Sequence, residues 1–246
     1  MGKRKNRNTE AYYQNPTRQK WIGWIVGGAK VILWTLVYTL IVSLPQLYVM
    51  YGSLLDNTWI TILGIVSIIY MFVVSYWFYR RYQKKHPENV ISLTWDDVLK
   101  DLGIFAAVLV FKLAMSYLMS GIYGEETTVN DEAIFGLLAG NTNILLALNL
   151  GLTVITMAPV MEEIIFRAMI SKGMFKDKNF TVAIILSSIF FSSMHLSGNI
   201  ISFIIYAGIG AGCFMAYWRK KNINDAILIH FLNNLPGAIM LIFGLY

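Results

Sequence analysis

The sequence predicts an all-α protein, a polytopic bundle of about seven transmembrane helices with its N-terminus in the cytosol. Three observations predict this fold class. The chain of 246 residues is 57% hydrophobic and only 14% charged, whereas about 25% of the residues of a soluble domain are charged. Its apolar residues form runs close to the ~20 residues that a helix needs to cross a bilayer. Basic residues are concentrated in every other connection between those runs.

The apolar runs give the expected helices in order. They cover residues 31–50, 59–78, 102–122, 144–165, 180–196, 200–218 and 226–243. The segments that flank these runs alternate in charge. Segments 1–20, 80–100, 172–178 and 219–221 are basic. The intervening segment 124–132 is acidic, and the turn near Asp56 and the segments 197–199 and 244–246 contain no Lys or Arg. By the positive-inside rule, the basic segments are cytosolic and the C-terminus is outside.

The same pattern predicts the organisation and the partners of the chain. We expect a basic cytosolic segment at 1–20, N-terminal transmembrane helices at 21–140 with a cytosolic linker or interfacial helix at 80–100, and a distinct C-terminal helical region at 141–246. The net charge of +6 reflects topology rather than nucleic-acid binding, so we expect no nucleic-acid partner. The expected surroundings are the lipid bilayer.

Ionised side chains inside a bilayer are costly, so each one needs a partner or a function. Glu163 and Arg167 are spaced i,i+4 on the fourth predicted helix and can neutralise one another. Glu162 is rotated from Glu163 by about 100° around a helix, so it lacks this local partner and is the candidate functional carboxylate. Lys112, deep in the third run, also needs a partner, which the sequence does not identify.

Two histidines lie in apolar runs and complete a candidate constellation. An antiparallel hairpin that turns near residues 176–179 would bring Glu162 and His195 to the same depth. His230 precedes Asn234 by four residues on one helix face, and Asn233 is nearly as well placed. Upright helices of uniform length would separate His230 from His195, so we expect short, tilted or partly sunken helices here.

These side chains favour hydrolysis of a peptide bond. A carboxylate and an imidazole can activate a water molecule, and a second imidazole with a carboxamide can donate hydrogen bonds to the resulting oxyanion. Other proteolytic arrangements are less well supported, because the sequence has neither a His-Glu-x-x-His motif nor a Gly-x-Ser-x-Gly motif.

The ordered motifs on successive C-terminal helices, Glu162-Glu163-x-x-x-Arg167, then Phe191-x-x-x-His195, then His230-x-x-x-Asn234, resemble the CPBP family. This family includes CAAX prenyl endopeptidases and bacteriocin-processing or self-immunity proteins, and is also called the Abi family. The resemblance covers about residues 142–246. It implies an intramembrane endopeptidase in which Glu162 and His195 activate water, His230 and Asn234 stabilise the oxyanion, and Glu163 and Arg167 support the site.

The resemblance leaves several alternatives open. The family has often been described as metalloproteases, so zinc held by Glu162, His195 and His230 is the alternative to the cofactor-free mechanism that we expect. The expected substrate is a membrane-associated peptide or a lipidated protein, and the expected location is a bacterial plasma membrane. The alternative function is a non-catalytic immunity or scaffold protein. A proton-coupled transporter is a third interpretation, although the sequence shows no internal repeat.

Overall fold

The computed structural model describes residues 16–138, 140–141 and 143–245, which form helices, turns and loops and contain no strand. Most of the predicted basic segment at 1–20 lies outside these residues. The main helices are α2 (Pro16–Tyr51), α3 (Asn57–Lys85), α4 (Trp95–Tyr123), α5 (Val129–Gly136), α6 (Ile144–Leu152), α7 (Ala158–Glu163), α8 (Phe180–Ser193), α9 (Ile200–Lys220) and α10 (Ile223–Phe243). The π-helical segment η3 (Thr153–Met157) joins α6 to α7. A second π-helical segment, η4 (Ile164–Met174), continues α7, so that these segments form one continuous helix.

Six helical stretches of the described chain are long and apolar enough to cross a membrane, including the continuous helix Ile144–Met174. The remaining apolar run forms α8, which has only 14 residues and rises roughly 21 Å, less than the ~30 Å hydrocarbon core. The predicted all-α, polytopic fold is therefore confirmed, and the chain is a multi-pass membrane protein.

The helices extend beyond their hydrophobic runs at the basic side of the bundle. Helix α3 continues to Lys85, with Lys84 and Lys85 in its last turn, where positive charge interacts favourably with the helix dipole. Helix α4 begins at Trp95 because Thr94 and Asp97 form a capping box. The predicted linker at 80–100 is thus reduced to a short connection that contains one 3₁₀ turn, Pro87–Asn89.

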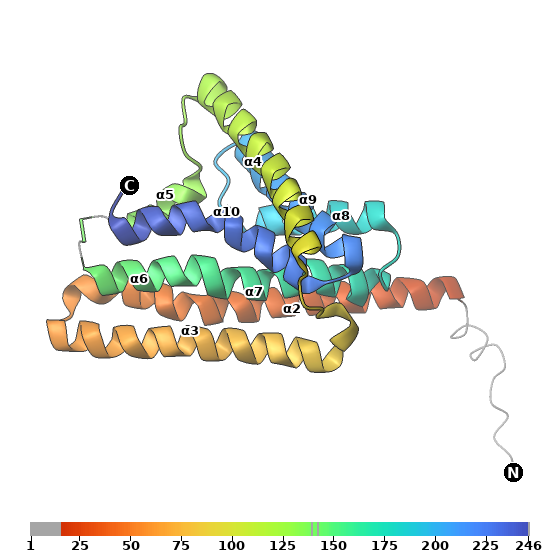
Figure 1. The fold of residues 1–246 in the computed structure, drawn as a ribbon, viewed down its shortest axis with the longest axis horizontal. Helices are drawn as coiled ribbons and strands as arrows, with labels where there is room; N and C mark the ends of the chain where they lie inside the picture. Colours follow the sequence, from red (N-terminus) through yellow and green to blue (C-terminus); the bar gives the residue numbers. More distant parts are fainter. Residues whose placement is uncertain (1–15, 139, 142, 246) are drawn as a thin grey trace, which may run out of the picture.

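Figure 1 shows α2, α3 and the continuous helix that contains α6 and α7 lying side by side, while α4 leans outward across the bundle. Helix α4 packs on α9 and α10. The contact with α9 is close because side chains of α4 occupy the space that a Cβ would need at two glycines, Phe111 at Gly208 and Val108 at Gly212. Larger residues at these two positions would push α4 away.

A buried ion cluster fixes the N-terminal end of α4. The Nη2 atom of Arg219 lies 2.8 Å from Oδ1 of Asp101 and 2.9 Å from Oδ1 of Asp225. The Nζ atom of Lys220 lies 2.5 Å from Oδ1 of Asp97. These contacts connect α4 to the end of α9 and the start of α10, so the tilted helix is anchored at the basic side of the bundle.

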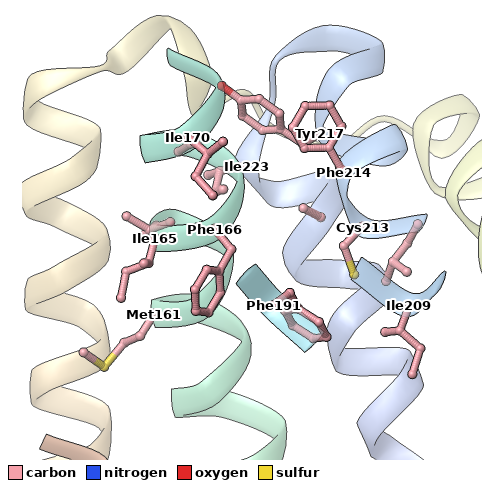
Figure 2. Close-up of a cluster of buried hydrophobic side chains, with 14 of the residues drawn as sticks. Met161, Ile165, Phe166, Ile170, Phe191, Ile209, Cys213, Phe214, Tyr217 and Ile223 are labelled. Atoms are coloured by element: carbon pink, nitrogen blue, oxygen red, sulfur yellow. The ribbon is translucent and has the colours of Figure 1, made fainter. Parts of the chain in front are cut away.

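The apolar core fills the space between α7, η4, α8, α9 and α10, as Figure 2 shows. Phe166 and Phe191 pack edge to face, with ring centroids 6.0 Å apart. Cys213 is fully buried in this cluster and forms no disulfide. The core thus holds α8 against the continuous helix, and with it the loop that contains His195.

Candidate active site

The site begins with a helix irregularity that Pro159 creates. In η3 the backbone is π-helical, and the N–H of Ala158 bonds to the carbonyl five residues earlier, that of Thr153. The next donor in this pattern would be residue 159, but proline has no N–H. The carbonyl of Val154 is therefore left free, and Nδ2 of Asn234 donates to it over 2.8 Å. Proline and π-helix together position Asn234.

Glu162 lies on α7 at the wall of a cavity and is nearly buried. Its Oε1 atom accepts a hydrogen bond from the hydroxyl of Tyr38, on α2. Its Oε2 atom has no hydrogen-bond partner among the described residues. Tyr38 thus fixes one oxygen of the carboxylate, while the other is buried without a hydrogen bond, which is costly for a charged group.

Glu163 has a different role, because its carboxylate contacts both Arg167 and His230. Its Oε2 lies 2.9 Å from Nε of Arg167, and its Oε1 lies 2.7 Å from Nδ1 of His230. The guanidinium carbon of Arg167 also lies 4.4 Å from the centroid of the Phe191 ring. The side chains of Glu163 and Arg167 are fully buried, so this ion pair, which the i,i+4 spacing predicted, is shielded from water.

His195 follows the end of α8 in a defined orientation. Its Nδ1 lies 2.8 Å from the carbonyl oxygen of Phe191, and because a carbonyl only accepts hydrogen bonds, Nδ1 carries the proton. The neutral ring therefore has its lone pair on Nε2, the atom that a general base uses. The imidazole stacks on Tyr206 at 4.4 Å and contacts Phe191 at 4.5 Å, which fixes the plane of the ring.

The same reasoning gives the state of His230. Its Nδ1 faces a carboxylate oxygen of Glu163, so Nδ1 is the donor and the neutral ring has an acceptor at Nε2. His230 can donate from Nε2 only when both ring nitrogens carry a proton, and Glu163 accepts the hydrogen bond from Nδ1. An oxyanion-binding role for His230 therefore depends on Glu163.

Short α8 explains how the two histidines meet. Because α8 ends at Ser193, His195 lies in the loop that follows and lines the same cavity as His230. The ring of Phe191 lies between the two imidazoles and is 5.5 Å from that of His230. The short or sunken helix that the sequence required is thus α8.

One cavity of about 560 Å³ brings the predicted residues together. Its wall includes Glu162, His195, His230 and both Asn233 and Asn234, whereas Glu163 and Arg167 lie behind it. Nδ2 of Asn233 donates to Oδ1 of Asn234 over 3.0 Å, so the two amides form a pair, and the structure does not select between them.

Helix α4 completes this cavity with Lys112. Within the part of the chain that the structure describes, no carboxylate lies at ion-pair distance from its Nζ. The acidic partner that the sequence required for Lys112 is therefore not among those residues. The lysine side chain is available to an anionic group inside the cavity.

Among the described residues, no group of three or more His, Cys, Asp or Glu side chains is placed to hold one metal ion. Both Nδ1 atoms and three of the four oxygens of Glu162 and Glu163 already have protein partners. These contacts fix the orientation of the four side chains.

Sequence reasoning missed Tyr38. It lies 124 positions from Glu162, in a helix that also contains other tyrosines, so no motif identifies it. We expect Tyr38→Phe to lower kcat by about 10-fold without changing KM, because a hydrogen bond to a charged group contributes about 1.5–3 kcal/mol and the cavity wall keeps its shape. Steady-state kinetics would test this, and a change in KM alone would contradict a role in positioning Glu162.

Comparison with known proteins agrees with these motifs. Residues 133–236 match the family described as type II CAAX prenyl endopeptidase Rce1-like. The chain is also 37% identical over 94 residues to UPF0177 protein YaiH of Lactococcus lactis subsp. lactis (strain IL1403). That match covers 36% of this chain and 38% of the relative. No solved structure matches the chain significantly. Residues 133–236 are therefore similar to the Rce1-like family, as the order of the motifs predicted.

Proposed function

We propose that this protein is an intramembrane endopeptidase that hydrolyses a peptide bond in a membrane-associated peptide or lipidated protein. One observation carries the proposal most directly. Oε2 of Glu162 is buried without a hydrogen-bond partner among the described residues, Nδ1 of His195 is occupied by a carbonyl, and both residues line the same cavity. A water molecule between these two bases would be activated for attack.

The remaining groups have complementary roles in the proposed reaction. Glu162 accepts the proton of the attacking water while Tyr38 holds its other oxygen. The oxyanion that forms on the substrate carbonyl is stabilised by Nε2–H of the His230 imidazolium and by the N–H of Asn234 that does not bond to Val154. Protonation of the leaving amine by Glu162 or His195 then completes cleavage.

The substrate class follows from the location of the cavity and from the family. The cavity lies within the bundle of membrane-crossing helices, and Lys112 offers it a positive charge that suits an acidic side chain or a terminal carboxylate of a bound peptide. The family name adds prenylated peptides to the candidates. We also propose a bacterial plasma membrane as the location, in view of the Lactococcus lactis relative.

We further propose that no metal takes part. The test is cleavage of candidate membrane peptides, with and without a prenylated cysteine, by the purified protein in proteoliposomes. Wild-type protein should cleave one class equally with and without a strong zinc chelator. His195→Gln should lose about 10²-fold or more of this activity, the range of general base catalysis.

Each alternative has its own result in this experiment. Activity that is lost on chelation and restored by zinc would replace the proposed mechanism by a metal-dependent one. Equal cleavage by wild type and His195→Gln would refute the assignment of His195. Absence of cleavage of every peptide by folded wild-type protein would favour the non-catalytic immunity or scaffold function.

A further inference from the structure

A second cavity, of about 980 Å³, lies between α2, α3 and η4, away from the proposed catalytic groups. Basic side chains surround it, namely Lys30, Arg80, Arg81, Lys84, Lys85 and Lys172. They come from three helices that are far apart in the sequence, and no acidic residue lines the cavity within the described chain. The structure thus concentrates positive charge around one hollow at the basic side of the bundle.

Little of this charge is neutralised by the protein. Lys172 pairs with Glu88, but Lys30, Arg80, Arg81, Lys84 and Lys85 have no ion-pair partner among the described residues.

Arg80 and Lys84 are spaced i,i+4 on α3, and so are Arg81 and Lys85. Like charges at this spacing destabilise a helix, and the partial charge at the end of α3 offsets only about half of one charge. An anion in the cavity would remove this repulsion.

Part of the wall of the same cavity consists of exposed apolar side chains. Val26 and Leu33 of α2 and Trp77 of α3 line the cavity and remain 46%, 58% and 49% exposed. These exposed apolar side chains are suited to contact with lipid acyl chains, because exposed apolar patches mark membrane or protein contact surfaces. A soluble anion would use only the basic rim, whereas a lipid would occupy both the rim and the walls.

We propose that this cavity binds one anionic phospholipid of the leaflet at the basic side of the protein. Its phosphate lies among the basic side chains of α3 and Lys30, and the upper parts of its acyl chains lie against Val26, Leu33 and Trp77. Basic pockets between helices at a cytosolic membrane face suit acidic headgroups. The proposal does not depend on the catalytic function, since none of these residues belongs to the catalytic cavity.

The test is native mass spectrometry of the purified full chain in detergent, titrated with phosphatidylglycerol or with phosphatidylcholine. We expect one phosphatidylglycerol to bind about 10-fold or more tightly than phosphatidylcholine. The double variant Arg80→Gln, Lys84→Gln should lose most of this preference, since each basic residue near an anionic surface contributes about five-fold. The matched control Lys176→Gln, Lys178→Gln removes the same charge from the same side but outside the cavity, and should retain it.

The other results would overturn the proposal. Equal binding of the two lipids by wild type would exclude a preference for anionic lipid. Equal losses in the two double variants would indicate general surface charge instead of a site. Displacement of phosphatidylglycerol by an equal concentration of glycerol 3-phosphate would indicate a soluble phosphate ligand. A melting temperature of Arg80→Gln, Lys84→Gln equal to or above that of wild type in phosphatidylcholine shows that the variant is folded, since the change removes a repulsive pair.

Discussion

Replacing Glu162 with glutamine is expected to lower the rate of peptide cleavage by about 10²–10⁴-fold, the range that a positioned general base contributes. Glutamine has the shape of glutamate, and its carbonyl oxygen still accepts the hydrogen bond from Tyr38. It cannot take a proton from water. The loss should therefore appear in the rate constant of cleavage measured under single-turnover conditions in proteoliposomes, while substrate binding changes little.

The control for this prediction is Glu162→Asp, which keeps a carboxylate but withdraws it by one methylene from Tyr38 and from the cavity. Glu162→Asp should retain more activity than Glu162→Gln, because aspartate can still accept a proton from water and only the position of its carboxylate changes. A melting temperature of Glu162→Gln close to that of wild type would show that the fold is intact. Cleavage by Glu162→Gln at the wild-type rate would remove Glu162 from the mechanism.

Much of this site follows from local spacing in the sequence. Glu163 and Arg167 share a helix face because they are four residues apart, and their ion pair is present. Glu162 and His195 lie equally far from the turn between two antiparallel helices, and they line one cavity. Such relations depend only on helix period and on a single turn, which the sequence determines locally.

Contacts between distant helices could not be derived in this way. The bond from Asn234 to Val154 depends on a π-helical register, and a helix of regular period would place a different carbonyl there. The partner of His230 was also unexpected. The sequence paired Glu163 with Arg167 alone, whereas in the structure Glu163 contacts both Arg167 and His230. The close contact of α4 with α9 depends on glycines of α9, which the sequence pattern does not distinguish from ordinary small residues of membrane helices.

The double role of Glu163 predicts a large effect on stability. Arg167→Met should reduce the free energy of unfolding by about 3–5 kcal/mol, because removing one partner of a buried pair leaves the other charge uncompensated. Both side chains of this pair are fully buried, and methionine fills part of the space beside Phe191. Denaturation in detergent, followed by tryptophan fluorescence or by a thermal shift, would measure the loss.

The double variant Arg167→Met, Glu163→Gln separates charge from packing. If the uncompensated carboxylate causes the loss, neutralising Glu163 should recover a large part of the stability, since replacing both members of a buried pair is often nearly neutral. A double variant no more stable than Arg167→Met would show instead that packing of the arginine dominates. The recovered fold should still cleave poorly, because glutamine replaces the charged acceptor that holds Nδ1 of His230 in place. Stability and activity should therefore separate in this one variant, which a purely structural role of Glu163 would not produce.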